Sequence, residues 1–593
     1  MHANIWHKTL LGATLLSLLY GFYRPETPAG AEGRSGQPAS PPIYPKDYFA
    51  SPVHDALRLG GTFCELRPNH FHSGIDIKSK TGGVGQPVLA AADGYIDRIK
   101  VQASGYGNVL YIKHPNGYTT LYAHLDRFAP EIERYVREQQ YKRERFEVEL
   151  APPDGSMRVR KGEEIGKLGN SGSSSGPHLH FEIRNTATGK SINPLLFGFS
   201  IDDRVPPDIR DMKVYFLNEK REVLGSKALP VRRQKNGRFG LEGDTLRLGA
   251  WRVGFGVKTY DQMNHLQNDN GVYSISLWAN DALAYQWVAD DLEFDETRYL
   301  NAHIDYAASQ RQGAWFNRCF LLPGNRFSGY TRTETLGAVP LYKDKPTKIS
   351  LKVADASGNA QSITFWALRD EYNMQTFSPP PAQHQIPYDA DTRVDFEDFS
   401  MTIGKGVLYE TLPLQYAVLP DQDADVYSPI HHVHDDETPA HRNFDLSIRP
   451  TRLPATLRDK AFIAYCGEGR PENCGGTWRD EYLHTRVRTF GNYCVMADTV
   501  PPTIRPVVFD EDMRRKSSMS FRIYDNFPTS GQADGLSYRG TVDGQWVLFE
   551  YDKKRSRLAH TFDGRIGSGE HWLRLVVRDD RGNQQVLERR FVR

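Results

Sequence analysis

Short stretches in which apolar and polar residues alternate, broken by Gly and Pro, recur along most of the chain. Residues 178–183 (HLHFEI) are one example, because every second residue is apolar. A period of two is that of a β-strand, whose successive side chains point to opposite faces. The 30 Tyr and 29 Phe residues also favour strands. The pattern predicts a mainly β protein, and 593 residues allow about three to five domains.

Two segments near the middle and the end of the chain repeat each other. The pattern D-x-V-P-P-x-I-R begins at Asp203 and again at Asp498, and L-x-V-x-D-x-x-G-N-x-Q begins at Leu351 and again at Leu575. Alternating apolar residues before a Gly-Asn turn indicate a strand, a turn and a second strand. We therefore expect residues 203–370 and 498–593 to be two copies of one β-sandwich, the first with a long insertion.

A third β module is expected over residues 376–497, between the two copies. Its strand patterns include residues 399–403 and 412–416, and Pro413 confines the second to an edge strand. The three modules resemble immunoglobulin-like domains, which serve as spacers or as contacts to other envelope proteins. Cys466 and Cys474 bracket a short loop and are one candidate disulfide among five cysteines, whose pairing the sequence leaves open.

The N-terminus carries the longest apolar run, from Leu10 to Leu19 and on to Tyr23, preceded by Lys8. This core suits a secretory signal better than a membrane-spanning helix, which needs about 20 apolar residues. The small residues 29–31 predict cleavage there, so 1–31 is the expected signal peptide and 32–47 a linker rich in Ser, Gly and Pro. Export to the periplasm or cell surface follows, with no membrane span in the mature chain; an uncleaved signal anchor is the alternative.

Charge and histidine placement narrow the function. The 74 basic and 73 acidic residues nearly cancel, which argues against a nucleic-acid binder. Three histidine clusters fall within the expected first domain, residues 48–200: His72 with Asp76, then His124, then His178 with His180.

The spacing within these clusters brings metal ligands together. His178 and His180 share one face of a strand, and His72 and Asp76 share one face of a strand or a helix. Two imidazoles and one carboxylate then converge, with a histidine left over. Zinc accepts such ligands and, in catalytic sites, keeps its fourth position for water.

Other readings of these residues stay open. An H-x-H pair alone is typical of a surface strand, and His70 competes with His72 as a ligand. His431, His432 and His434 form a further cluster in the third module, without a partner motif. Cys64 is interpreted as a packed core residue. Residues 130–145 predict an amphipathic helix that either lies on the surface or forms a wall of a substrate groove.

Residues 69–77 (NHFHSGIDI), 122–125 (YAHL) and 176–182 (GPHLHFE) resemble the signature segments of the lysostaphin/LytM-like zinc endopeptidases, over about residues 49–197. The resemblance implies an antiparallel β-sheet domain with an open groove over one Zn²⁺ per chain. It implies that His72, Asp76 and His180 hold the zinc, and that His178 and His124 assist the water and the transition state. The implied substrate is the peptide part of bacterial peptidoglycan.

Two alternative functions remain consistent with the sequence. Some relatives have lost ligands and only activate cell-wall amidases, whereas all five positions are intact here. The first alternative is such a non-enzymatic regulator, and the second is an adhesin or scaffold in which the metal is structural. The family's oxyanion-holding tyrosine has no assigned counterpart in the sequence.

Overall fold

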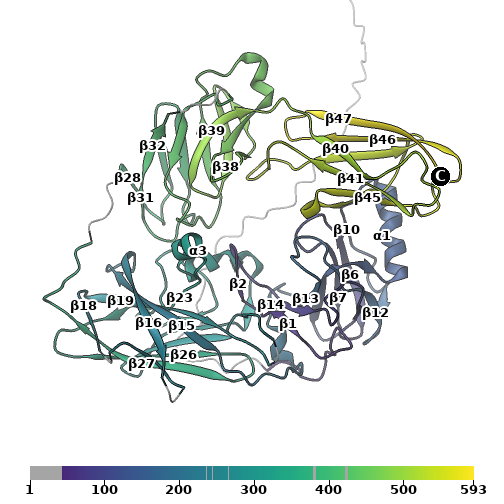
Figure 1. The fold of residues 1–593 in the computed structure, drawn as a ribbon. Helices are drawn as coiled ribbons and strands as arrows, with labels where there is room; N and C mark the ends of the chain where they lie inside the picture. Colours follow the sequence, from purple (N-terminus) through teal and green to yellow (C-terminus); the bar gives the residue numbers. More distant parts are fainter. Residues whose placement is uncertain (1–42, 235–236, 244, 265, 378–381, 421–424) are drawn as a thin grey trace, which may run out of the picture.

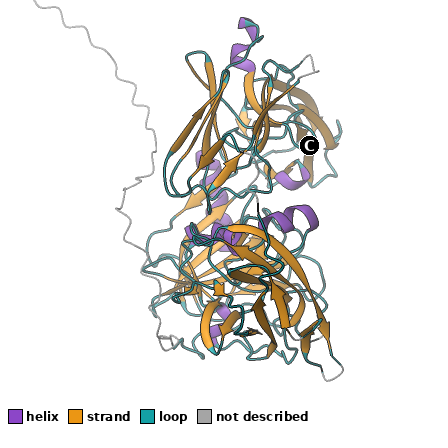
Figure 2. Cartoon of the chain, turned by 90° about the vertical axis from the view of Figure 1, so that its left-hand side faces the viewer, coloured by secondary structure: helices purple, strands orange, loops and turns teal. Residues whose placement is uncertain are grey.

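The computed structural model describes residues 43–593 except 235–236, 244, 265, 378–381 and 421–424. The expected signal peptide, 1–31, lies outside the described residues, as does most of the expected linker. Four β-rich units follow one another and close into a ring, in which the fourth lies against the first (Figure 1). Strands dominate every unit and helices are few and short (Figure 2). The predicted mainly β architecture is confirmed.

The first unit is built on an antiparallel sheet in the order β1-β4-β13-β8-β7-β6-β10, with β11 beside β6 and β14 beside β13. Its strands are β1 (Leu59–Gly61), β4 (Ile75–Lys78), β6 (Gly94–Val101), β7 (Asn108–Lys113), β8 (Tyr118–Leu125), β10 (Val148–Leu150), β11 (Arg158–Val159), β13 (His178–Asn185) and β14 (Ser191–Ile192). Smaller elements are β2 (Leu66–Arg67), β3 (His70–Phe71), β5 (Pro87–Leu89), β9 (Arg127–Phe128), β12 (Glu164–Lys167) and the 3-10 helix η1 (Pro194–Phe197). Alternate residues of the central strands, such as Ile75 and Phe181, are fully buried in its core.

The helix expected over residues 130–145 is present as α1 (Pro130–Arg143), with Pro130 in its first turn. Ile132 and Val136 are buried toward the first unit. The outer side of α1 meets the fourth unit: the Tyr141 ring packs on Trp546 at 5.1 Å between centroids. The helix therefore contacts two units, while Glu131, Arg134 and Glu138 remain exposed on the surface.

The second unit contains a 12-stranded sheet whose main order is β23-β19-β15-β16-β17-β27-β26-β20-β21-β24. Its strands are β15 (Asp208–Leu217), β16 (Val223–Arg233), β17 (Phe239–Leu241), β18 (Thr245–Leu248), β19 (Arg252–Tyr260), β20 (Ser274–Ala279), β21 (Ala282–Val288), β23 (Asn317–Arg318), β24 (Tyr330–Thr331), β25 (Val339–Pro340), β26 (Thr347–Ala354) and β27 (Ala360–Arg369). Helices η2 (Phe294–Tyr299), α2 (Leu300–His303) and α3 (Tyr306–Gln312) follow β22 (Asp291–Leu292). Because β22 pairs with β14, the sheet of the first unit continues into the second.

The third unit consists of two five-stranded sheets, β29-β30-β34-β38-β37 and β32-β33-β39-β35-β36, with a two-stranded sheet of β28 and β31. Its elements are β28 (His384–Ile386), β29 (Thr392–Asp395), β30 (Phe399–Ile403), β31 (Leu412–Leu414), β32 (Tyr416–Leu419), β33 (Ile430–Val433), β34 (Phe444–Ile448), η3 (Ala455–Lys460), β35 (Ala461–Tyr465), β36 (Glu472–Asn473), β37 (Thr477–Arg479), β38 (Tyr482–Val487) and β39 (Gly491–Ala497). Among the described residues β31, which contains Pro413, pairs only with β28, so it is an edge strand as predicted.

The fourth unit consists of two four-stranded sheets, β40-β41-β45-β44 and β43-β42-β46-β47. Its elements are β40 (Thr503–Val508), β41 (Ser518–Tyr524), β42 (Ser537–Val542), β43 (Gln545–Trp546), β44 (Glu550–Asp552), η4 (Lys553–Arg555), β45 (Arg557–Thr561), β46 (Glu570–Arg578) and β47 (Gln584–Val592). The Gly-Asn turns of the repeat join β26 to β27 and β46 to β47, and both glycines, Gly358 and Gly582, have the positive φ that such a turn requires.

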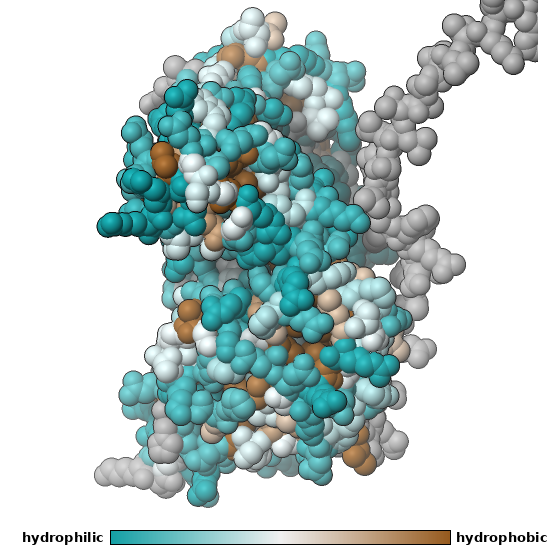
Figure 3. All heavy atoms as spheres, turned by 90° about the vertical axis from the view of Figure 1, so that its right-hand side faces the viewer, coloured by the Kyte–Doolittle hydropathy of each residue, from teal (hydrophilic) through white to brown (hydrophobic). Residues whose placement is uncertain are grey.

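Polar contacts also close the ring between the fourth unit and the first. Lys554 Nζ donates to the carbonyl oxygen of Ser174 at 2.8 Å and to the side-chain oxygen of Asn170 at 3.1 Å. Arg137 of α1 lies 3.7 Å from Asp563. On the face of the molecule shown in Figure 3, polar side chains dominate and apolar ones occur in small separate groups. No described helix combines the length and apolar character needed to cross a membrane.

The structure does not pair Cys466 with Cys474, the candidate that the sequence offered. Cys466 follows β35, whose neighbour β39 carries Cys494, and this register brings the two sulfur atoms to 3.3 Å. Cys474 instead is buried, with its sulfur 3.4 Å from Ser530 Oγ of the fourth unit. Strand pairing rather than closeness along the chain decides which cysteines meet.

Candidate metal centre

Three side chains from neighbouring strands converge on one point of the first unit. Asp76 lies on β4 directly opposite His180 on β13, and His72 lies on the segment just before β4. His72 Nε2 is 2.9 Å from His180 Nδ1, and each of these nitrogens is 3.0 Å from Asp76 Oδ1. All three side chains are buried, and they form a group able to hold a metal ion.

The donor set fits zinc in size and chemistry. Zinc–ligand bonds of about 2.0–2.1 Å place tetrahedral ligand atoms roughly 3.3 Å apart, close to the separations of this triangle. Asp76 offers one oxygen to the group, while its Oδ2 accepts a hydrogen bond from Arg67 at 2.9 Å. The carboxylate orientation is therefore held by a residue outside the group.

Each ligand-type imidazole has its second nitrogen held by another acceptor. His72 Nδ1 lies 2.8 Å from the Thr62 carbonyl oxygen, and His180 Nε2 lies 2.9 Å from Glu182 Oε1. Such contacts orient the ring and keep the first nitrogen free for a metal. His180 thus offers Nδ1 to the group, whereas His72 offers Nε2.

Glu182 is a fully buried carboxylate at the back of the site. It accepts hydrogen bonds from Tyr106 at 2.6 Å, Ser73 at 2.8 Å, Ser191 at 3.0 Å and Arg184 at 2.6 Å, besides its contact with His180. Burial opposes ionisation, but Arg184 and His180 outweigh it and hold the pKa of Glu182 far below its usual range. The charge is fully compensated, so the network can anchor the His180 ring.

Two further histidines stand beside the group. His178 Nδ1 lies 2.9 Å from the Gly176 carbonyl oxygen, and its Nε2 is 3.3 Å from Asp76 Oδ1. His124 Nδ1 lies 2.9 Å from the Ser171 carbonyl oxygen, and its ring is 4.8 Å from that of His178. The loop 170–176 therefore orients both rings.

The pKa values of His124 and His180 are shifted in opposite directions. Burial, together with the neighbouring His180 and His178, lowers the pKa of His124 to about 3, so this ring is neutral. Burial also opposes charging of His180, but its contacts with Asp76 and Glu182 raise its pKa to about 9. Despite its burial, Asp76 has a pKa well below the usual value because His72, His178 and His180 surround it. The carboxylate is therefore ionised at neutral pH.

Close packing at Gly74 explains the Ser-Gly-Ile-Asp sequence. A Cβ at this position would lie 2.5 Å from the Phe181 carbonyl oxygen and 3.0 Å from the His180 ring. Only glycine lets the His72 segment approach β13 closely enough for His72 and His180 to meet.

The other histidines considered as metal ligands lie outside this group. His70 is exposed and its ring contacts the Pro68 carbonyl oxygen. His431, His432 and His434 contact Tyr416, Asn492 and Thr438, respectively, and belong to no metal-type group among the described residues. Cys64 is buried in the core shared with the second unit, as its interpretation as a packed residue requires.

The sequence reasoning missed Glu182, Tyr106 and Arg67. The signal for Glu182 was present, because it lies two residues after His180 on the same face of the same strand. Tyr106 belongs to the Gly-Tyr-Gly-Asn turn, and its ring centroid lies 5.4 Å from that of His180. Nothing in the local sequence of Arg67 indicates that it reaches Asp76.

The family model of peptidase family M23 matches residues 70–141 and 154–194, the part of the chain that contains this centre. This part of the chain is a peptidase family M23 domain. The predicted resemblance to the lysostaphin/LytM-like peptidases is thereby confirmed for the domain. A second family model, the Zu5-like domain, matches residues 383–498, which make up the third unit.

Curated relatives of the M23 domain carry two kinds of name. The DD-carboxypeptidase/endopeptidase Mpg of Neisseria meningitidis is 38% identical over 124 residues, 21% of this chain and 22% of that protein. The murein hydrolase activator NlpD of Escherichia coli is 37% identical over 126 residues, 21% of this chain and 26% of that protein. The chain thus spans only about a fifth to a quarter of these relatives.

Among solved structures, the catalytic domain of the prophage-encoded M23 protein EnpA from Enterococcus faecalis is similar to the same region. It is 26% identical and covers 26% of this chain and 95% of that chain, with a TM-score of 0.17.

Proposed function

We propose that this protein is an exported zinc metalloendopeptidase that hydrolyses peptide bonds in bacterial peptidoglycan. The observation that carries the proposal is the intact set His72, Asp76 and His180, with His178 and His124 beside it. An activator has no need of metal ligands or of two further histidines. The M23 relative named as an endopeptidase agrees with this reading.

The residues divide the chemistry between them. His72, Asp76 and His180 would hold the zinc, which when bound supplies an activated water and polarises the scissile carbonyl. His124 is neutral and lies beside His178, and its low pKa makes it a weak base, so it would accept a hydrogen bond from the water and position it. His178, half-buried at the edge of the group, would take a proton from the attacking water, hydrogen-bond the developing oxyanion and pass that proton to the leaving amine.

The proposed setting is the periplasm or cell surface, where the N-terminal apolar run would direct the chain. Peptidoglycan peptides are the proposed partners of the M23 domain. The three following units, which pack into a ring with it, are proposed to contact other envelope proteins. Both relatives named above carry names consistent with work on the cell wall.

The test combines metal content with digestion of purified peptidoglycan sacculi by the chain lacking residues 1–31. We expect about one zinc per chain and newly freed peptide ends, which mass analysis of the released fragments identifies. His180→Ala is the inactive variant, and His70→Ala, on an exposed histidine outside the centre, is its matched control. Zinc binding without any release of fragments would contradict the proposal.

The similarity to a murein hydrolase activator supports a second candidate, a regulator of another wall hydrolase. Digestion without added partner proteins separates the two. A regulator releases fragments only when the partner hydrolase is present, and then His178→Ala leaves that stimulation unchanged.

A further inference from the structure

The repeat in the second and fourth units places the same acidic residues at equivalent positions. One is the first residue of the D-x-V-P-P motif, one precedes the Gly-Asn turn, and one follows a Tyr at the end of β19 or β41. The structure brings each set together, with one oxygen of every carboxylate within 4.8 Å of the others. The sets are Asp203, Asp261 and Asp355 in the second unit, and Asp498, Asp525 and Asp579 in the fourth. We call them the two aspartate trios.

The hydrogen bonds around the trios are also repeated. In both copies the aspartate of the D-x-V-P-P motif accepts a backbone amide two residues later, and the aspartate before the turn accepts the amide of the turn asparagine. The bonds are Val205 to Asp203 at 3.1 Å, Val500 to Asp498 at 3.0 Å, Asn359 to Asp355 at 2.9 Å and Asn583 to Asp579 at 2.8 Å. Each backbone amide occupies only one oxygen of its carboxylate.

Other oxygens of the trios are buried without a partner. Asp261 is 2% exposed and its Oδ1 has no hydrogen-bond donor; Asp498 is 1% exposed and its Oδ2 has none. The fourth unit adds three such atoms: Asp525 Oδ1, Asp579 Oδ2 and Asn526 Oδ1. Within the described part of the chain, no Lys, Arg or His nitrogen lies within 4.0 Å of these carboxylates. Buried carboxylates without counter-charge are strongly unfavourable.

The close approach of the buried aspartates raises the pKa of one carboxyl in each trio. Burial and the neighbouring Asp203 and Asp355 raise the pKa of Asp261 to about 8. Burial and the neighbouring Asp498 and Asp579 raise that of Asp525 to about 7. Each trio therefore lacks a positive charge that its geometry would accommodate.

We propose that each aspartate trio binds one Ca²⁺ ion. The donors are carboxylate and amide oxygens without histidine or cysteine, which selects a hard cation over zinc. Ca²⁺ accepts the irregular arrangement of several protein oxygens, whereas Mg²⁺ requires a near-octahedral shell and keeps most of its water. These sites are independent of the M23 centre and of its proposed reaction.

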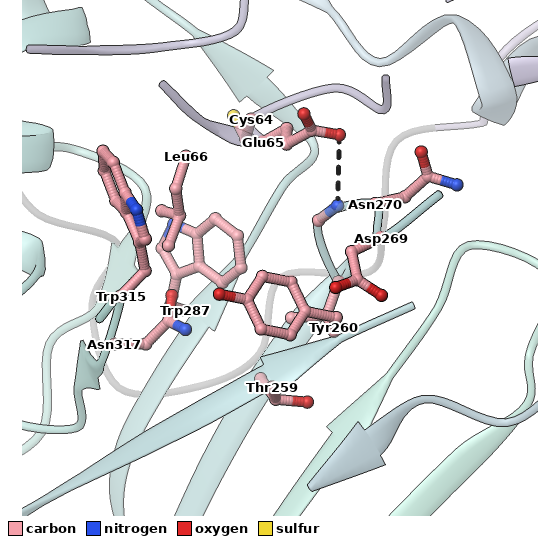
Figure 4. Close-up of a pocket in the computed structure, with 12 residues that line it drawn as sticks. Cys64, Glu65, Leu66, Thr259, Tyr260, Asp269, Asn270, Trp287, Trp315 and Asn317 are labelled. Carbon is pink, nitrogen blue, oxygen red and sulfur yellow. Dashed lines mark hydrogen bonds between the residues drawn. The ribbon is translucent and has the colours of Figure 1, made fainter. Parts of the chain in front are cut away.

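Both trios lie where one unit joins the next. Asp203 lies between η1 of the first unit and β15 of the second, and a cavity beside Asp203 and Asp261 is also lined by Thr62 and Asn193 of the M23 side. A neighbouring cavity of about 190 Å³ shows the same junction, where Glu65 faces Asn270 and accepts a hydrogen bond from the Gly271 amide at 3.3 Å (Figure 4).

The second trio lies at the junction of the third and fourth units. Asp498 directly follows β39, and its amide donates to the Lys460 carbonyl oxygen at 3.0 Å. Lys460 Nζ in turn donates to Asn583 Oδ1, at 2.6 Å, on the turn that carries Asp579. A cation in either trio would therefore fasten two neighbouring units to each other.

Calcium binding to the full, zinc-loaded chain tests the proposal. In calcium-free buffer titrated to about 1 mM Ca²⁺, calorimetry should show two ions bound per chain, with a rise of several degrees in the melting temperature. Asp261→Asn and Asp525→Asn should each leave one ion, and the double variant none. Exposed acids of the same units provide matched controls, Asp281→Asn and Asp510→Asn, which should keep both.

Limited proteolysis provides a second readout that does not depend on the stoichiometry. Without Ca²⁺, cleavage should increase at residues 198–207 and 498–502, the connecting segments at the two junctions, and Asp261→Asn should increase it only at the first. Because each single variant retains the other trio, its remaining Ca²⁺ shows that the chain is folded. Absence of binding at about 1 mM Ca²⁺, or unchanged binding by the double variant, would overturn the proposal.

Discussion

The histidines of the M23 domain and those of the third unit are both grouped, but only the first group is built as a metal centre. In the M23 domain, His72 and His180 aim one nitrogen each at Asp76, while Thr62 and Glu182 hold the others. In the third unit, His431, His432 and His434 are closer together in sequence, yet they contact three different partners. His431 and His432 are successive residues of β33 and point to opposite faces, and His434 lies beyond the end of that strand, so the three rings do not converge. Closeness of histidines in the sequence is therefore a weaker sign of a metal site than two features of the structure. These are a carboxylate that both imidazoles approach, and a hydrogen-bond partner for the second nitrogen of each imidazole.

Removal of a metal ligand should have the largest effect. His180→Ala should lose zinc and lower turnover by at least about a thousandfold, because both the water and the carbonyl depend on the metal. Zinc content and sacculus digestion measure the two effects. His432→Ala in the third unit should change neither, and the comparison fails if the two variants behave alike.

The two non-ligand histidines should separate metal binding from turnover. His178→Ala and His124→Ala are expected to retain zinc while turnover falls by about 10²–10³, because the first loses a proton-transfer group and the second a group that positions the water. Metal analysis and initial rates on the same preparations give the result. Full activity in either variant would show that its histidine has no part in the reaction.

A substitution at Glu182 tests how much its contact with His180 Nε2 contributes to zinc binding. Glu182→Gln should weaken zinc binding by about 10–100-fold, because the amide holds the His180 ring less firmly than the carboxylate. Competition with a chelator measures the affinity, and circular dichroism shows whether the sheet is intact. Glu149→Gln, at an exposed glutamate paired with Lys100, serves as the control. Equal zinc affinity in both variants would remove Glu182 from the metal centre.

The last expected effect is on stability rather than on zinc binding or turnover, and it concerns a structural histidine of the third unit. Burial lowers the pKa of His431 to about 4, below the value of about 6.5 in an unfolded chain. Between these values the unfolded chain binds more protons, so the stabilisation is complete above pH ~6.5 and is lost as the pH falls toward 4, by up to about 3 kcal/mol.

Urea unfolding at several pH values measures this loss. The midpoint for His431→Gln should depend less on pH between 6.5 and 4.5 than that of the parent chain. Identical pH profiles would show that His431 does not titrate in this range.

Part of this architecture could be predicted because it depends on local patterns. The period of two placed His178 and His180 on one face, and the Gly-Asn turns of the repeat are present in both copies. The contact of α1 with the fourth unit and the approach of Cys466 to Cys494 could not be predicted from the sequence. Each depends on which distant strand or unit packs against that segment. The expected signal peptide falls outside the described residues, and both it and the exact domain boundaries stay predictions.

By itself, the sequence determined the strand-rich fold, the donor types and the faces on which they lie, since these follow from residue chemistry and a short periodicity. Only the tertiary structure decided that Asp76 lies opposite His180, that Glu182 and Arg67 hold the ligands, and that the aspartates of the repeat converge at unit junctions. The physical reason is that strand pairing and unit packing are chosen by burial of the whole core, which no local segment specifies.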